Sequence, residues 1–254
     1  MYKTILIVLS LLLVNGCRSA LLYTTNNIPV PLIQHQGETQ ISGQYGTNGK
    51  SFNLVSSPLK NISVSIAGNY DNVTVNSDIE DKNLEDKNTH NYTEVAIGYY
   101  DDLSESIMGE AFVGYGLGDA KDDYYEQHQT GGFFSSKYNL TRDRAFGKYA
   151  KYFLQANLGK KNEVFTTGFA IRVAYVNFFE ITKFHDEGAN LPLNEGVPTF
   201  PSKTSAVFFE PAIFAKIGGK NLQLEVEVMF PYTQKDIDFD YKGYLIATGL
   251  RFIF

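Results

Sequence analysis

An alternation of apolar and polar side chains with a period of two constrains the fold of this chain more than any other feature. Between Leu222 and Phe230 every even-numbered residue is apolar, and three of the four residues between them are Gln or Glu. Successive side chains of a β-strand point to opposite faces, whereas a helix would scatter this pattern around its surface. The alternation therefore predicts strands that each have one apolar and one polar face.

The same alternation recurs along the chain and predicts about ten strands, within a range of eight to twelve. We expect their bounds to be accurate to two to four residues. The predicted strands are 38–46, 51–57, 62–71, 91–100, 107–118, 148–159, 164–180, 205–217, 221–230 and 243–254. Short connections alternate with longer polar ones, which cover 72–90, 119–147, 181–204 and 231–242. Short turns at one end and long loops at the other are typical of a single antiparallel transmembrane β-barrel, with periplasmic turns and extracellular loops.

The polar face of the predicted strands indicates which side of the barrel is the inside. A soluble barrel has an apolar interior, whereas a membrane barrel has an apolar exterior. The polar face here is rich in residues small enough to relieve crowding inside a narrow barrel. These residues are Ser63, Ser65, Ala67, Ala96, Gly98, Gly114, Gly116, Gly168, Ala170, Ala174, Ala212, Ala247 and Gly249. We therefore place the polar face in the lumen and the Leu, Val, Ile, Phe and Tyr face toward lipid.

Charged side chains of both signs fall on the same inner face. They are Glu94, Glu110, Lys151, Arg172, Glu210, Lys216, Glu225, Glu227 and Arg251. Ten strands enclose a lumen only slightly wider than that of an eight-stranded barrel, which side chains fill. We expect these charges to satisfy one another and fix the register of the strands. The alternative is that they line a narrow, selective pore.

The N-terminal residues have the features of an export signal. Lys3 precedes an apolar run from Ile5 to Val14 that is too short to span a membrane. Cys17, the only cysteine, follows Val14-Asn15-Gly16 in a loose match to a lipobox. We expect a signal peptide at 1–16, lipidation of Cys17 and an extended tether over 17–36 before the barrel at 37–254. The alternative is an ordinary signal peptide with Cys17 as a bystander.

The C-terminus and two internal motifs carry a resemblance to a known group. Leu250, Phe252 and Phe254 end the last strand on an aromatic residue, which resembles the signal read by the barrel-assembly machinery. Tyr149-Ala150-Lys151-Tyr152-Phe153-Leu154-Gln155 and Tyr175-Val176-Asn177-Phe178 look like outer-membrane β-barrel proteins of Bacteroidota. The resemblance covers the ten strands and the lipobox-like start. It implies a bacterial outer-membrane location, with outer-membrane lipid and the assembly machinery as partners, but no settled activity.

Composition and motifs exclude several functions. The formal net charge of −6 argues against nucleic-acid binding, which needs a basic surface. One cysteine cannot build a cysteine zinc site, and we expect no metal and no cofactor. His35 lies in the predicted tether, whereas His90, His128 and His185 lie in predicted outer loops. Glu126-Gln127-His128 and His185-Asp186-Glu187 could meet at the rim as an acid–base site, but loop histidines are mostly solvated.

We therefore expect a non-enzymatic structural or surface-interaction protein with a side-chain-filled lumen. The alternatives are a small-solute, porin-like channel, a rim-site enzyme and a soluble lipid-binding lipoprotein barrel. An even number of strands returns Phe254 to the side of the barrel where its first strand begins. A lipid-anchored N-terminus is then expected on the periplasmic side, beside Phe254.

Overall fold

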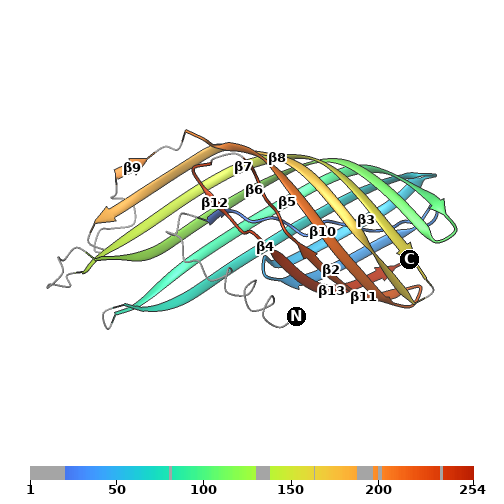
Figure 1. The fold of residues 1–254 in the computed structure, drawn as a ribbon, viewed down its shortest axis with the longest axis horizontal. Helices are drawn as coiled ribbons and strands as arrows, with labels where there is room; N and C mark the ends of the chain where they lie inside the picture. Colours follow the sequence, from blue (N-terminus) through green and yellow to red (C-terminus); the bar gives the residue numbers. More distant parts are fainter. Residues whose placement is uncertain are drawn as a thin grey trace, which may run out of the picture.

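The computed structural model shows an all-β chain whose main feature is a closed, ten-stranded antiparallel barrel (Figure 1). It describes residues 21–79, 82–129, 138–162, 164–187, 197–199, 202–234 and 237–254. The barrel strands are β2 (Thr39–Gly46), β3 (Gly49–Leu59), β4 (Ile62–Ile79), β5 (Lys82–Ser104), β6 (Ile107–Gln129), β7 (Tyr138–Lys161), β8 (Phe165–Glu187), β10 (Ser205–Gly218), β11 (Leu222–Met229) and β13 (Leu245–Ile253). The predicted fold class and strand number are confirmed.

Two pairings close the sheet into a barrel. The last strand, β13, pairs antiparallel with the first barrel strand, β2, with Arg251 opposite Ser42. After the long β8–β10 connection, strand β10 pairs antiparallel with β8 from Ser205 to Ile217. Each barrel strand is therefore hydrogen-bonded on both sides along the closed part of the barrel, as a structure in lipid requires.

Three short strands lie outside the barrel sheet proper. Strand β9 (Val197–Thr199) extends the edge of β8 at the long-loop end. Strands β1 (Leu21–Tyr23) and β12 (Asp240–Tyr241) form a separate parallel pair. No helix among the described residues is long and apolar enough to cross a membrane.

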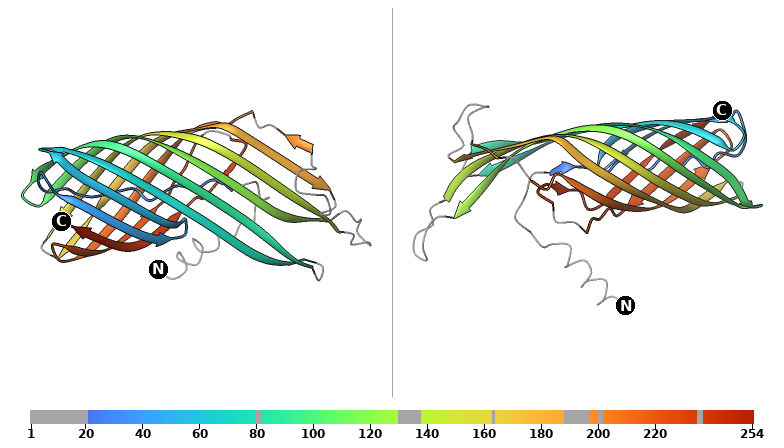
Figure 2. Two further views of the ribbon diagram at one scale, coloured as in Figure 1. Left: turned by 180° about the vertical axis from the view of Figure 1, so that it is seen from behind. Right: turned by 90° about the horizontal axis from the view of Figure 1, so that it is seen from above.

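Strands β4–β8 are much longer than the other barrel strands, which corrects the predicted loops. Much of 72–90, 119–147 and 181–204 is paired strand: β4 and β5 stay paired to Ile79 and Lys82, and β6 and β7 to Gln129 and Tyr138. Pairing with β3 ends at Tyr70 of β4. We call the outer parts of β4–β8 the extension; they run to the strand tips from Tyr70 and from the residues level with it in the other strands, which are Asn91, Asp119, Lys148 and Glu180. It projects past β2, β11 and β13 at the end away from the C-terminus (Figures 1 and 2). Sequence alternation gives little signal there, because backbone pairing between strands does not by itself require an apolar face.

The two faces of the closed barrel have the predicted orientation. The inner face carries buried small residues, among them Ser63, Ala170 and Ala174, each with no exposed surface. Inner glycines make room for neighbouring rings: a Cβ on Gly114 would lie 2.2 Å from the Phe153 ring. The outer face carries exposed apolar side chains, including Ile97, Leu154 and Leu250. This distribution is the reverse of that in a soluble barrel.

Residues 21–33, which we call the lumen segment, lie inside the barrel. From Leu22 to Ile33 every residue is buried, and the blue chain after β1 runs lengthwise through the barrel toward the end that holds the C-terminus (Figure 1). This part of the predicted tether is therefore an interior element. Its sequence carries no charged side chain, so it fills the lumen without adding charge to it.

The lumen segment has a definite direction inside the barrel. Gly37 and Thr39 lie at the short-turn end, where the Thr39 N–H donates to the Phe254 carbonyl oxygen over 3.2 Å. Leu21 lies at the opposite end, where its N–H donates to Asp122 of β6. Leu21 therefore does not share the short-turn end with Phe254, because the segment crosses the whole barrel before β2 begins.

Candidate functional site

The nine charged residues predicted on the inner face are all buried in the lumen. The alternation of the strands places each of them inward, as the sequence indicates. Six of them form three ion pairs with one another, and the remaining three hold the lumen segment. The lumen is therefore the candidate functional site.

Two of the ion pairs reach between strands that are not neighbours. Arg172 of β8 binds both carboxylate oxygens of Glu94 of β5, at 2.9 and 3.0 Å. Its guanidinium also lies 4.0 Å from the centre of the Phe153 ring. Lys151 of β7 donates to both oxygens of Glu210 of β10, each at 3.0 Å. Because these pairs skip one or two intervening strands, they link parts of the barrel wall that the β-ladder does not join directly.

The third pair joins adjacent strands near the seam of the barrel. Arg251 of β13 donates to Glu225 of β11 at 2.6 and 2.8 Å, and to Gln40 of β2. Gln44 of β2 donates to the other oxygen of Glu225 at 2.7 Å. The pair thus links the first and last barrel strands and supports their register.

The other three predicted charges bind the backbone of the lumen segment. Glu227 accepts from the Ile28 N–H and Glu110 from the Ile33 N–H, both over 2.9 Å. Lys216 donates to the carbonyl oxygens of Val30 and Pro31. Buried backbone groups need partners, and here charged side chains of the wall supply them in place of a β-ladder.

Neutral residues extend this binding along the segment. Gln155 and Asn157 of β7 donate to the Pro29 carbonyl oxygen at 2.7 and 3.3 Å. At the other end the Tyr23 hydroxyl donates to Glu210 over 2.7 Å. Tyr23 thereby joins the lumen segment to the Lys151–Glu210 pair, so the two parts of the network are continuous.

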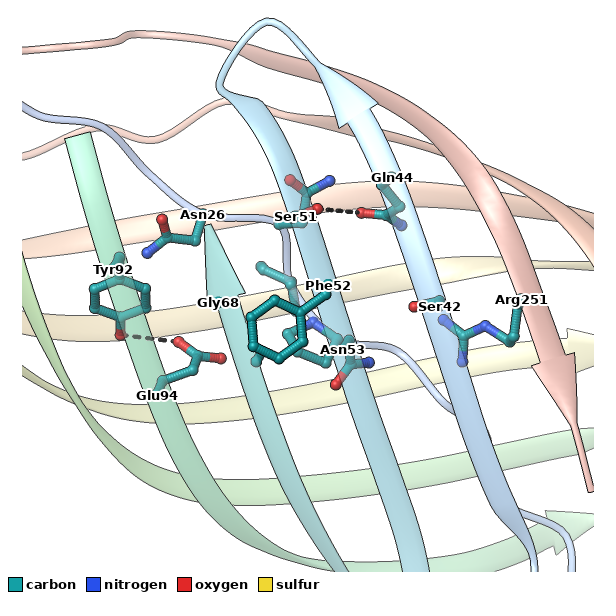
Figure 3. A pocket seen from close by; sticks show the side chains of 14 residues that line it. Asn26, Ser42, Gln44, Ser51, Phe52, Asn53, Gly68, Tyr92, Glu94 and Arg251 are labelled. Carbon is teal, nitrogen blue, oxygen red and sulfur yellow. Dashed lines mark hydrogen bonds between the residues drawn. The ribbon is translucent and has the colours of Figure 1, made fainter. Parts of the chain in front are cut away.

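A small cavity of about 20 Å³ remains between the lumen segment and strands β2–β5 (Figure 3). Asn26 and Asn53 point into it, near the Tyr92–Glu94 and Ser51–Gln44 hydrogen bonds that Figure 3 marks. Both amide ends of Asn26 and the Oδ1 atom of Asn53 are buried without a hydrogen-bond partner among the described residues. Polar groups of this kind are usually satisfied by buried water, so the cavity is suited to ordered solvent.

The histidines do not converge on one site. His90 is buried on the inner face, where its Nε2 lies 2.7 Å from the Tyr149 hydroxyl. His35 is exposed at the short-turn end, beside Gln36. His185 Nδ1 lies 2.7 Å from an Asp143 oxygen in the extension. The side chains of the predicted partners Glu126, His128, Asp186 and Glu187 lie outside the described part of the structure.

At the long-loop end, the β11–β13 connection packs against the chain that leads into β10. Asp238 accepts hydrogen bonds from the backbone N–H groups of Lys203 and Ser202, each over 2.9 Å. The bond from Lys203, above all, holds the pKa of the Asp238 carboxyl below its usual value. Lys183 of β8 donates to the Asp238 carbonyl oxygen. These contacts bring two long connections together above the lumen.

The remaining predicted site residues lie away from the lumen. Cys17 falls outside the described residues. Leu250, Phe252 and Phe254 point outward from the last strand, and Phe254 is 70% exposed. Among the described residues no group of His, Cys, Asp and Glu is arranged to hold a metal ion. The terminal aromatic residues are thus accessible from outside the barrel.

The lumen segment itself is what sequence reasoning missed. The run Ile28-Pro29-Val30-Pro31-Leu32-Ile33 is almost wholly apolar, which is unusual for a solvated tether. Its two prolines lack backbone donors and so reduce the number of groups that the lumen must satisfy. That apolar run was the available signal, but it has no periodicity from which to predict a location.

Comparisons with known proteins give matches only at the level of structure. No family model matches the chain, and no curated protein matches its sequence. The translocator domain of the autotransporter NalP from Neisseria meningitidis superimposes with a TM-score of 0.42 and 8% identity, over 85% of each chain. LpxR from Salmonella typhimurium gives a TM-score of 0.34 and 10% identity, over 85% of this chain and all of that one.

These neighbours are outer-membrane β-barrels, but identities and scores this low transfer no activity. They do correct one expectation. LpxR is an outer-membrane lipid A deacylase, so a barrel architecture is no reason to expect the absence of enzymatic activity, and that expectation is withdrawn. The chain is a closed ten-stranded antiparallel barrel of the kind found among outer-membrane proteins.

Proposed function

We propose that this chain is a bacterial outer-membrane barrel that closes its own lumen with residues 21–33 and presents its extension at the cell surface. Its role is structural or in surface interaction. The observation that carries the proposal is the binding of the lumen segment by wall residues along its length, from Asp122 at one end to Glu110 at the other.

The exterior of the closed barrel supports its placement in a membrane. Strand β6 exposes Val113, Tyr115 and Leu117, and β7 exposes Tyr152, Leu154 and Leu158. Exposed apolar patches much larger than a few hundred Å² are rare on soluble monomers. A band of such residues around a closed barrel suits lipid contact, and a barrel without edges satisfies its backbone without water.

The interior supports a closed state over an open pore. In an open pore, inward charges face water, whereas here Arg172, Lys151 and Glu210 have no exposed surface. Removing a charge from water is costly unless it is paired and hydrogen-bonded. The ion pairs and the lumen segment supply those partners, so the network is most stable when the lumen is filled.

Conductance in planar lipid bilayers tests the proposal. We expect the full chain to show no steady ion conductance, and a variant lacking residues 21–33 to conduct. A variant in which a Gly/Ser segment of equal length replaces residues 21–33 serves as the matched control, because it keeps the chain length but not the side chains. Heat-modifiable gel mobility shows whether each variant has closed its barrel.

Steady conductance of the full chain, equal to that of the deletion variant, would contradict closure and favour the porin-like alternative. A barrel released from membranes in aqueous buffer would contradict the membrane placement itself. The two failures are separate, because the first is measured in a barrel that has already inserted.

A second candidate, hydrolysis at the long-loop end, rests on the His185–Asp143 contact. A carboxylate 2.7 Å from an imidazole nitrogen is the arrangement that orients a general base. The test compares the lipids of outer membranes that hold native chain or the His185→Ala variant by mass spectrometry. A change that the His185→Ala variant abolishes supports this candidate, and identical lipid profiles for native, variant and empty cells contradict it.

A further inference from the structure

The lumen segment has a defined direction, which its end contacts fix. At its N-terminal end, the Leu21 N–H donates to Asp122 of β6 over 2.9 Å, and the Leu21 carbonyl oxygen accepts from Asn88 of β5 over 3.1 Å. Both partners belong to the extension. Strand β1 also pairs with β12, in the long connection between β11 and β13. The segment therefore starts at the long-loop end.

Its C-terminal end lies at the short turns. Ile33 packs in a small cluster with Val55 and Tyr100. Gln36 then donates to the Pro58 carbonyl oxygen over 3.2 Å, and the Gly37 N–H donates to the Ser57 carbonyl oxygen over 2.7 Å. Pro58 belongs to the end of β3 that leads into the short β3–β4 turn. The segment thus ends where β2 begins.

The length of the segment suits a complete crossing of a bilayer. An extended chain advances at most about 3.3–3.6 Å per residue, so residues 21–33 reach on the order of 40 Å. A bilayer with its headgroups is about 40–45 Å thick. Intermediate contacts follow in order along the wall, with Glu227 at Ile28 and Lys216 at Val30. The segment crosses once and does not turn back.

We propose that the chain threads its own barrel from outside to inside, so that the residues before Leu21 emerge at the extracellular surface. Cys17 precedes Leu21 by four residues and cannot lie more than about 15 Å from it. A lipid on Cys17 would then enter the outer leaflet from the cell exterior. This deepens the proposed function and rests on its placement of the long-loop end outside the cell.

The hydrogen bonds of the segment give this threading a physical basis. Charged wall residues bind its backbone at Ile28, Val30 and Ile33, so withdrawing it would leave Glu227, Lys216 and Glu110 without these partners. Buried groups that lose their partners are costly. The segment is also continuous with β2, which pairs with β13 at the closing seam. The lumen segment thus leads directly into the strand that closes the barrel.

Labelling of intact cells with a membrane-impermeant maleimide tests the proposal. The introduced thiol is Ser19→Cys, and all variants carry Cys17→Ser so that each has a single thiol. The matched controls are Thr74→Cys, exposed in the extension, and Lys60→Cys, exposed in the β3–β4 turn. We expect Ser19→Cys to react in intact cells to the same extent as Thr74→Cys. Lys60→Cys should react only after the outer membrane is made permeable.

Reaction of Ser19→Cys only after permeabilisation, in parallel with Lys60→Cys, would overturn the threading. If neither treatment labels it, an epitope inserted between Ser19 and Ala20 decides: antibody binding on intact cells supports the proposal, and binding only after permeabilisation overturns it. Failure of the controls themselves, with Thr74→Cys unreactive in intact cells, would instead contradict the outer-membrane placement. The two proposals can thus fail separately.

Discussion

The inner and outer faces of the barrel wall contrast sharply. Along β8, Arg172 and Ala174 point inward and are fully buried, whereas Ile171, Val173 and Tyr175 point outward and are exposed. In a soluble protein the apolar side would be buried and the charged side exposed. The contrast agrees with the proposed placement of the outer face in lipid, and it shows that the inner face satisfies its charges within the protein.

The faces also differ in how they depend on neighbours. In the proposed membrane placement, each outer side chain needs only to be apolar. Each inner charge needs a particular partner, and Glu210 accepts three hydrogen bonds from two residues, Tyr23 and Lys151. Single substitutions should therefore cost more inside than outside.

The largest effect is expected for Arg172→Leu. This change leaves the Glu94 carboxylate buried without its ion-pair partner, although Tyr92 still donates to it. Removing one member of a buried pair costs about 3–5 kcal/mol. We expect a marked fall in the heat-unfolding temperature in detergent, measured by the gel mobility of the barrel.

The double variant Arg172→Leu with Glu94→Leu is the control. It removes both charges, so much of the lost stability should return. Equal unfolding temperatures for the native chain and Arg172→Leu would show that the lumen is wet enough to solvate a lone carboxylate.

The next effect is expected for Val113→Arg on the outer face. Val113 lies midway along the apolar part of β6 and is 52% exposed. An arginine at the middle of the lipid-facing band costs about 2–4 kcal/mol, because it must be taken out of water. Folding into lipid vesicles, followed by urea titration, measures the change. Val113→Ile should leave stability nearly unchanged, and an equally small effect of Val113→Arg would indicate that this face is solvated.

A smaller effect is expected for Tyr23→Phe, which tests the hold of the wall on the lumen segment. The change removes the hydroxyl that donates to Glu210 but keeps the ring against Phe208. Because Glu210 retains Lys151, we expect a loss of about 1–2 kcal/mol. Urea titration measures it. An unchanged urea midpoint for Tyr23→Phe would show that this hydrogen bond adds nothing to the stability of the barrel.

The smallest effect is expected for Lys148→Ala in the extension. Lys148 and Glu180 form a 2.7 Å ion pair, but both side chains are more than half exposed. Exposed pairs contribute about 0–1 kcal/mol and are screened by salt. We expect a change below about 0.5 kcal/mol by urea titration at moderate salt. A loss as large as that of Arg172→Leu would place this pair in a far drier environment than its exposure indicates.

The sequence predicted the number of strands and the inward direction of the site residues, but not the full length of the strands. The ten strands and the inward direction of residues such as Glu94 and Arg172 follow from parity, because a period of two assigns each side chain to a face. The extra length of β4–β8 did not follow, since both faces of the extension are free to carry polar residues. In the hairpin of β4 and β5, for example, Asn76 lies opposite Glu85 on one face, and the other face mixes Val75 with Asp86.

The sequence by itself determined the barrel, its number of strands and the face on which the charges lie, because these depend on local alternation and on loop lengths. Only the tertiary structure decided which charges pair, and that residues 21–33 fill the lumen. Partners such as Arg172 and Glu94 are brought together by closure of the sheet, which no local pattern encodes. The lumen segment has no period at all, and its place is set by the wall groups that bind its backbone.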